Sequence, residues 1–205
     1  MRSIKKMGSV VGLVVAVVAL TGAASASATP LITPAGTAFS GTSSGEHVFT
    51  INSNLKVRCD HATFSGTTSN PASDTTLFTP AYGDMAAAGK WCRLYVGGVF
   101  TAGTVTPTGQ WSLKVTSLSG VTSSGHVTTS GVTHITVGPC TIDVPSGTVV
   151  PVTGTNVASP TGVHLVASGT GLSYTSSGCS GFGVPASGTT ATYSGTVDIP
   201  GLTVS

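Results

Sequence analysis

Charged side chains are scarce in this chain: only 7% of its 205 residues are Asp, Glu, Lys or Arg. Three of the eight basic residues, Arg2, Lys5 and Lys6, lie at the N-terminus, so the chain beyond residue 28 has a net charge of −1. No basic cluster is left that could neutralise phosphate groups, which excludes nucleic acid as a partner. The same shortage excludes attachment to anionic lipid through a polybasic segment.

Closely spaced cysteines are missing too, because the four cysteines are at least 33 residues apart. A structural zinc site normally uses close pairs such as C-x-x-C, so we expect no metal site and no cofactor. An even number of cysteines in an exported chain predicts two disulfides. Three pairings of Cys59, Cys92, Cys140 and Cys179 are possible, and we favour Cys59–Cys92 with Cys140–Cys179 because each joins neighbouring elements.

Long apolar runs are limited to the N-terminus. A basic start is followed by the apolar stretch 10–20 and by the small-residue sequence Ala24-Ser25-Ala26-Ser27-Ala28. This order is typical of a secretory signal peptide, and the apolar stretch is short for a membrane span of about 20 residues. We therefore expect residues 1–28 to be a cleaved signal peptide and residues 29–205 to be an exported domain with no membrane span, secreted or held at the cell surface.

A helical pattern is almost absent, apart from a short run at 84–88 that predicts at most one turn of helix. Alternating apolar and polar residues instead predict short strands, as at Leu55–Cys59, Trp111–Thr116 and Val163–Ser168. Gly and Pro separate these strands at short intervals. The sequence therefore predicts an all-β, antiparallel sandwich or barrel-like fold, either one domain or two packed halves at 29–118 and 119–205.

One short motif occurs twice. Ala62-Thr63-Phe64-Ser65-Gly66-Thr67 returns as residues 191–196 with Tyr193 in place of Phe64, and Phe39-Ser40-Gly41-Thr42 is a shorter echo. We interpret the copies as equivalent corners where a strand enters a turn, on neighbouring strands. Chance repetition in a composition rich in Ser, Gly and Thr is the alternative.

Catalytic patterns are weak. Residues 41–45 fit the G-x-S-x-G pattern around Ser43, but no helix is predicted after them, as a nucleophile elbow requires. Asp60 and His61 are adjacent, so on a strand they point to opposite faces. His47, His126, His134 and His164 are scattered, and we predict that they lie on the surface or at edges. We predict no catalytic residue.

Aromatic residues make up only 6% of the chain. Trp91, Trp111, Tyr82 and Tyr95 could line a site for a sugar or an apolar ligand, although packing in the core is the more common use of such residues.

The order of these features resembles a broad group of small secreted actinobacterial β-proteins of unassigned function. The features are a leader, a strand ending in Cys59, the Ala-Thr-Phe-Ser-Gly-Thr motif, Gly138-Pro139-Cys140 and the closing motif copy. In composition and layout the chain is also similar to the secreted activator-of-alkane-oxidation proteins. The resemblance implies an exported β-protein near or outside the cell envelope, and it transfers no catalytic residue.

The function that the sequence favours is therefore a non-enzymatic one, in which an exported β-sandwich protein has a cell-surface, matrix or binding role. Two alternatives stay open: a secreted hydrolase, and a carrier or emulsifier of apolar compounds. Its partners are unknown, and contact with the envelope or with an apolar ligand fits the composition.

Overall fold

The computed structural model describes residues 29–52, 55–83, 92–96 and 99–205. Within these residues the chain forms strands and one short 3-10 helix, η1 (Ser180–Phe182). The strands are β1 (Ile32–Thr33), β2 (Ala38–Ser43), β3 (His47–Asn52), β4 (Leu55–Cys59), β5 (Ala62–Thr67), β6 (Thr75–Tyr82), β7 (Cys92–Val96), β8 (Val99–Pro107), β9 (Trp111–Ser119), β10 (Thr122–Thr129), β11 (Thr133–Val137), β12 (Cys140–Val144), β13 (Val149–Ala158), β14 (Thr161–Ser177), β15 (Ser187–Pro200) and β16 (Thr203–Val204).

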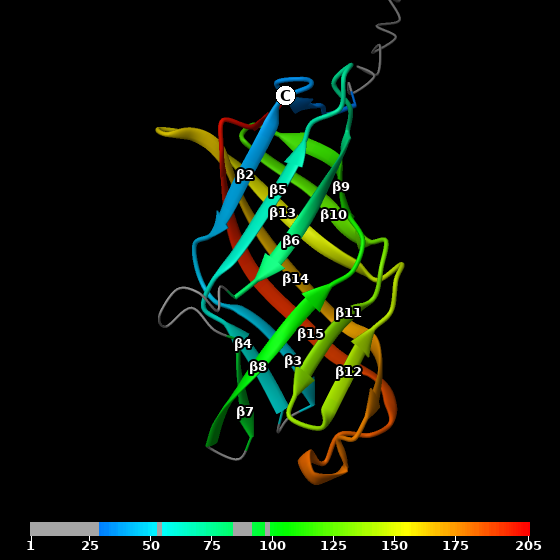
Figure 1. Cartoon of the computed structure of the whole chain (residues 1–205). Helices are drawn as coiled ribbons and strands as arrows, with labels where there is room; N and C mark the ends of the chain where they lie inside the picture. The colour runs from blue at the N-terminus through cyan, green and yellow to red at the C-terminus, as the bar shows by residue number, and fades with distance from the viewer. Residues whose placement is uncertain (1–28, 53–54, 84–91, 97–98) are drawn as a thin grey trace, which may run out of the picture.

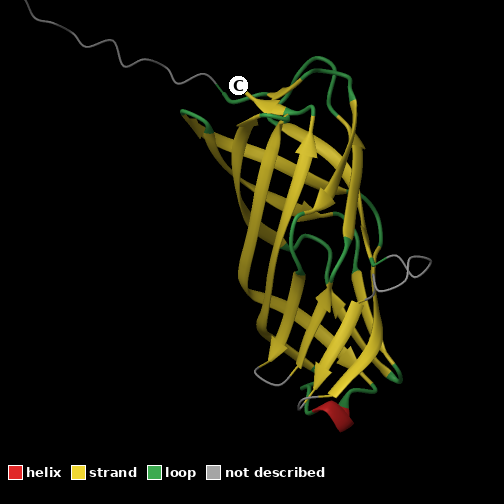
Figure 2. Ribbon diagram, turned by 90° about the vertical axis from the view of Figure 1, so that its left-hand side faces the viewer, coloured by secondary structure: helices red, strands yellow, loops and turns green. Residues whose placement is uncertain are grey.

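The strands β2 to β15 close into one antiparallel circuit, and an added pairing of β14 with β15 runs across it. This pairing divides the described strands into two closed rings that share β14 and β15. The first ring contains β2, β5, β6, β9, β10, β13, β14 and β15, and the second contains β3, β4, β7, β8, β11, β12, β14 and β15. The rings stack end to end, with the first at the top of Figures 1 and 2. The prediction of an all-β, antiparallel, barrel-like fold is confirmed.

The shared strands are unusually long, with 17 residues in β14 and 14 in β15. Near its start β14 pairs with β13, and near its end it pairs with β12. On β15, Val197 and Asp198 pair with β2, whereas residues 192–194 pair with β3. Register shifts between Gly169 and Tyr174 mark the passage from one ring to the other. Bulges of this kind bend a strand and so let one strand serve two barrels.

Strands from both ends of the chain contribute to both rings. In the segment 29–118, β2, β5, β6 and β9 build the first ring, and β3, β4, β7 and β8 build the second. The later strands are divided in the same way. Neither 29–118 nor 119–205 holds a complete ring, and the division of the chain into domains stays a prediction.

The interior of both rings is apolar because alternate residues point inward. The strand β4 shows this simply: Leu55, Val57 and Cys59 are fully buried, while Lys56 and Arg58 face outward. The small β1–β16 sheet closes the top of the first ring (Figure 1). No helix in the described residues has the length and apolar character needed to cross a membrane.

Aromatic rings fill the level at which the two rings meet, and we call this set the waist cluster. Its members stack against one another at centroid distances between 4.8 and 6.2 Å. They are His47, Phe49, Phe64, Phe78, Tyr82, Trp111 and Tyr193. Tyr193 comes from the shared strand β15, whereas His47 and Phe49 come from β3 of the second ring. The cluster therefore joins the cores of both rings.

The repeated motif was expected to form corners between a strand and a turn, and this expectation was wrong. Its two copies lie within strands β5 and β15, and its echo lies on β2 between them. Strands β2 and β5 pair so that Phe39 is opposite Gly66 and Gly41 is opposite Phe64. A Cβ added to Gly66 would lie 2.8 Å from the ring of Phe39. Here the echo places the ring of Phe39 against the glycine of the motif on the next strand.

Two strands run against the usual sequence signals. Strand β6 continues through Pro80 to Tyr82, although proline normally ends a strand. Strand β9 pairs with β6 only from Thr75 to Phe78, so the missing N–H of Pro80 lies beyond that ladder. Strand β10 consists mainly of Ser, Thr and Gly, a composition that resembles a loop.

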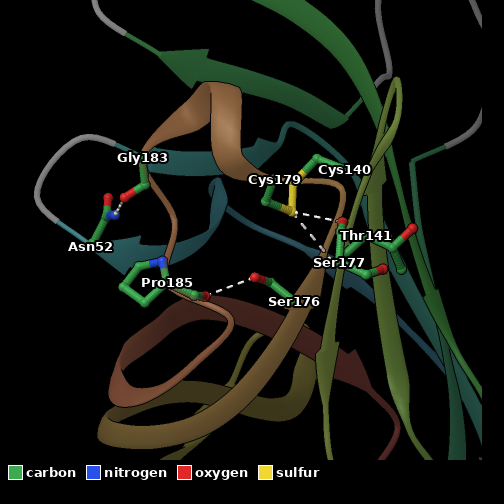
Figure 3. Close-up of a disulfide and its surroundings, with 8 residues drawn as sticks. All are labelled: Asn52, Cys140, Thr141, Ser176, Ser177, Cys179, Gly183 and Pro185. Atoms are coloured by element: carbon green, nitrogen blue, oxygen red, sulfur yellow. Dashed lines mark hydrogen bonds between the residues drawn. A yellow bond between two sulfur atoms is a disulfide. The ribbon is translucent and has the colours of Figure 1, made fainter.

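Both disulfides have the favoured pairing, Cys59–Cys92 and Cys140–Cys179. Cys59 and Cys92 are directly opposite each other on β4 and β7, with a Cα–Cα distance of 4.0 Å. Cys179 ties the segment around η1 to β12 at the lower end of the second ring (Figure 3). There the Ser176 hydroxyl donates to the Pro185 carbonyl, and the Asn52 amide donates to the Gly183 carbonyl.

The signal peptide at 1–28, the helical turn at 84–88 and Trp91 lie outside the described residues. These expectations stay predictions.

Candidate functional site

A groove of about 360 Å³ lies on the outside of the first ring, where the β13–β14 hairpin meets the end of β15. Its volume falls within the range of roughly 300–1,000 Å³ that is usual for small-molecule sites. Four strands of one sheet surface, β2, β13, β14 and β15, and the turn between β13 and β14 supply its walls. The lining residues are Thr42, Val157, Pro160, Gly162, Val163, His164, Asp198, Ile199 and Pro200.

The polar centre of the groove is a pair formed by His164 and Asp198. They are directly opposite each other on β14 and β15, and the His164 Nδ1 lies 2.5 Å from Oδ1 of Asp198. Both point outward because their neighbours Val163 and Ile199 occupy buried positions. Thr42 of β2 is opposite Asp198 on its other side. Three adjacent strands therefore present a hydroxyl, a carboxylate and an imidazole in a row.

The walls beside this row are apolar. Val157, Pro160 and Pro200 contribute side chains without hydrogen-bonding groups, and 37% of Val157 is exposed. Gly162 keeps β14 close to β15, since an added Cβ would lie 2.8 Å from the carbonyl oxygen of Ile199. A few polar groups among apolar walls are the usual composition of a small-ligand site.

The pair fixes the chemistry that the groove can offer. In the neutral imidazole, an Nδ1–H that donates to Asp198 leaves Nε2 as an acceptor. Oδ2 of Asp198 has no hydrogen-bond partner within the described residues, so it can accept a second bond. The groove is therefore suited to a ligand that brings hydrogen-bond donors, such as an amine or a hydroxyl.

Catalysis finds less support in this geometry. In the described residues, no Ser or Thr hydroxyl hydrogen-bonds to His164, and Thr42 is next to Asp198 rather than to the imidazole. A nucleophile would need a hydrogen bond to its base. The described residues also contain no group of three or more His, Cys, Asp or Glu that could hold a metal ion.

The second ring contains a twin of this pair, away from the groove. His134 and Asp143 are opposite each other on β11 and β12, and His134 Nδ1 lies 2.7 Å from Asp143 Oδ1. Neither residue lines the groove. The twin separates the effect of an exposed His–Asp pair from the effect of the groove around it.

The residues singled out in the sequence do not converge. The Ser43 hydroxyl accepts a hydrogen bond from the Ala62 N–H at 3.0 Å. Asp60 forms an ion pair with Arg93 at 2.7 Å, away from any histidine contact. His126 lies between Lys114 and Pro151 in the sheet. His164 was predicted only as a surface histidine, and its partner Asp198 was not considered, because the two are 34 residues apart and meet through strand pairing.

His47 is the opposite case, since it was predicted at the surface and is completely buried. Its Nδ1 lies 2.6 Å from the Tyr193 hydroxyl, which lies 3.0 Å from that of Tyr82. Burial lowers the pKa of His47 to about 4; the backbone of Thr196 favours the charged form, and the nearby charge of His61 opposes it. In the sequence, His47 alternates with the apolar residues Phe49 and Ile51 along one strand, and this pattern was the signal that its side chain is buried.

The interior offers little room for a ligand. Inside the first ring lies a cavity of about 50 Å³, with a lining that is almost wholly apolar and includes Phe39, Phe78 and Leu165. An engineered apolar cavity that binds benzene has a volume of about 150 Å³, and this cavity has only about a third of that volume.

Comparison of the chain with protein-family profiles, with curated proteins and with solved structures finds no match.

Proposed function

We propose that this chain is an exported, non-enzymatic binding protein, and that the groove at His164 and Asp198 takes a small ligand with an apolar body and a donor group. The observation that carries the proposal is a groove of about 360 Å³ in which apolar walls adjoin a carboxylate oxygen that has no hydrogen-bond partner among the described residues. An alkyl chain or ring would contact Val157, Pro160 and Pro200. An ammonium or hydroxyl group would bind Asp198.

Export is part of the proposal. The two disulfides fit an oxidising compartment, since cytosolic thiols are normally kept reduced. The expected signal peptide at residues 1–28 supports export, and the resemblance to secreted actinobacterial proteins agrees with it. A cell-surface or matrix role is compatible with a rigid double ring that binds its ligand on the outside.

The test uses n-hexylamine and cyclohexanol as probes, titrated into ¹⁵N-labelled protein while amide chemical shifts are recorded. We expect saturable shifts at Gly162, Val163 and Ile199 that are lost in Asp198→Asn. The control variant Asp143→Asn removes the same carboxylate from the twin pair and should leave the shifts intact. Absence of groove shifts with both probes, or an equal loss in the control, would contradict the proposal.

A further inference from the structure

The hairpin formed by β7 and β8 exposes a concentration of apolar side chains. Of Val99, 67% is exposed, and the values for Phe100 and Tyr95 are 59% and 39%. Tyr95 and Phe100 are opposite each other, with ring centroids 5.0 Å apart. Apolar residues that are exposed singly are ordinary, but adjacent exposed aromatic rings mark an interaction surface.

The same hairpin leaves a backbone edge without a partner. Strand β8 pairs with β7 from Val99 to Gly103, but with β11 only from Thr104 to Pro107. Towards its tip the hairpin diverges from β11 (Figure 1). Gly103 already lies against β11, since a Cβ added there would be 3.2 Å from the carbonyl oxygen of Thr136. Within the described residues, no other strand or loop hydrogen-bonds to the backbone at 99–102. The segment Val-Phe-Thr-Ala at this edge contains no charge and no proline, the devices that usually protect an edge strand.

We infer that the edge Val99–Ala102 is an interaction surface for a second copy of this chain, which adds its own β8 edge in antiparallel orientation. Such a contact is two-fold symmetric, so one segment satisfies both partners. It would extend the sheet through β7-β8-β8-β7 and cover Phe100 and Tyr95 of both copies. The inference does not depend on the groove, which lies on the other ring.

The charges near the hairpin are compatible with this pairing. Arg58 and Arg93 are neutralised by ion pairs with Glu46 and Asp60, so among the described residues Lys56 is the only charge on β4 and β7 without an ion pair. In the paired sheet, the two copies of β4 would be five strand spacings apart, or roughly 24 Å. This exceeds the Debye length of about 8 Å at physiological salt, so the two Lys56 residues would repel each other little.

The small number of exposed residues indicates a weak dimer, because an interface below about 1,200 Å² is typical of transient contacts. Sedimentation velocity from about 10 μM to 1 mM should show a concentration-dependent dimer. Phe100→Lys should weaken dimerisation tenfold or more. Val121→Lys is the matched control, since Val121 is 60% exposed and belongs to the turn between β9 and β10, and it should behave as the wild type.

Hydrogen exchange of the unmodified protein gives a second readout that does not require a variant. Amides at 99–102 should become more protected as the concentration rises, whereas those of the β9–β10 turn should not change. A monomer at every concentration, or a dimer unaffected by Phe100→Lys and without new protection at 99–102, would overturn the inference. Sedimentation of monomers with phosphatidylglycerol vesicles, lost in Phe100→Lys, would also overturn it and assign the hairpin to a membrane surface.

Discussion

His47 shows how strongly one residue can be altered by its position in a closed ring. Its imidazole is enclosed by the waist cluster, and its Nε2 reaches no hydrogen-bond partner of normal geometry within the described residues. A charged imidazole would lose its hydration there with little compensation. The same burial raises the pKa values of Tyr82 and Tyr193, so all three groups stay neutral over the physiological range.

Acid is therefore expected to destabilise the fold through His47. Its pKa is 6.5 when unfolded and about 4 when folded, so the stability is fully present above pH 6.5 and falls as the pH drops to 4. The difference corresponds to about 3 kcal/mol. Urea unfolding at pH 7 and pH 4 should show a loss that is larger by about this amount in the wild type than in His47→Gln. An equal loss in both proteins would contradict this account.

Gly195 is the residue that makes room for this histidine. A Cβ added at Gly195 would lie 2.2 Å from the His47 Nδ1, so the ring would have to move. Gly195→Ala should destabilise the protein by about 1–3 kcal/mol, the usual cost of overpacking a core. Gly181→Ala is the control, because an added Cβ there meets nothing within 4 Å. Denaturant midpoints that shift equally in both variants would refute the explanation.

At the scale of elements, alternation predicted the strands whose two faces differ, such as β4 with its buried Leu55 and exposed Arg58. It could not predict β10, because Ser123 is buried and polar and the only large apolar residue that β10 buries is Val127. It predicted only the stretch Val163–Ser168 of β14, since Gly169 and Gly171 look like breaks. The glycines are instead the bulged region where the strand changes rings.

The groove could not be predicted for a related reason. Its centre depends on the register between β14 and β15, and no local pattern specifies which residue faces His164. The disulfide pairing could be predicted, because it depends only on an even number of cysteines, an oxidising compartment and rough proximity in the fold. The proximity follows from the positions of Cys59 and Cys92 in alternating strands.

The disulfides are expected to contribute strongly to stability, since few ion pairs are available. The bonds span 33 and 39 residues, for which the chain-entropy model gives about 3–4 kcal/mol each. For a domain of this size, losing one bond should lower the melting temperature by roughly 6–16 °C. Calorimetry of Cys59→Ala/Cys92→Ala and of Cys140→Ala/Cys179→Ala should show these shifts. Melting temperatures unchanged by both double variants would show that the bonds are not stabilising.

At the scale of the whole molecule, the proposed export predicts where the chain found in the medium begins. The small-residue sequence from Ala24 to Ala28 offers two overlapping cleavage sites, so the exported protein should begin at Thr29 or Ser27. Intact-mass measurement of protein from the culture medium tests this, with the cell-associated precursor as the reference. A mass that includes Met1 in the medium would exclude cleavage.

The double ring also determines how the protein should unfold. Each ring contains four strands from each end of the chain, and both rings contain β14 and β15, so neither can close without the other part of the sequence. The waist cluster links their cores through Tyr193. We therefore expect one cooperative transition, with calorimetric and van't Hoff enthalpies in agreement. Gly66→Ala in the first ring and removal of Cys140–Cys179 in the second should each lower the midpoint of this single transition. Two separate transitions, each sensitive to only one of these changes, would show that the rings are independent units.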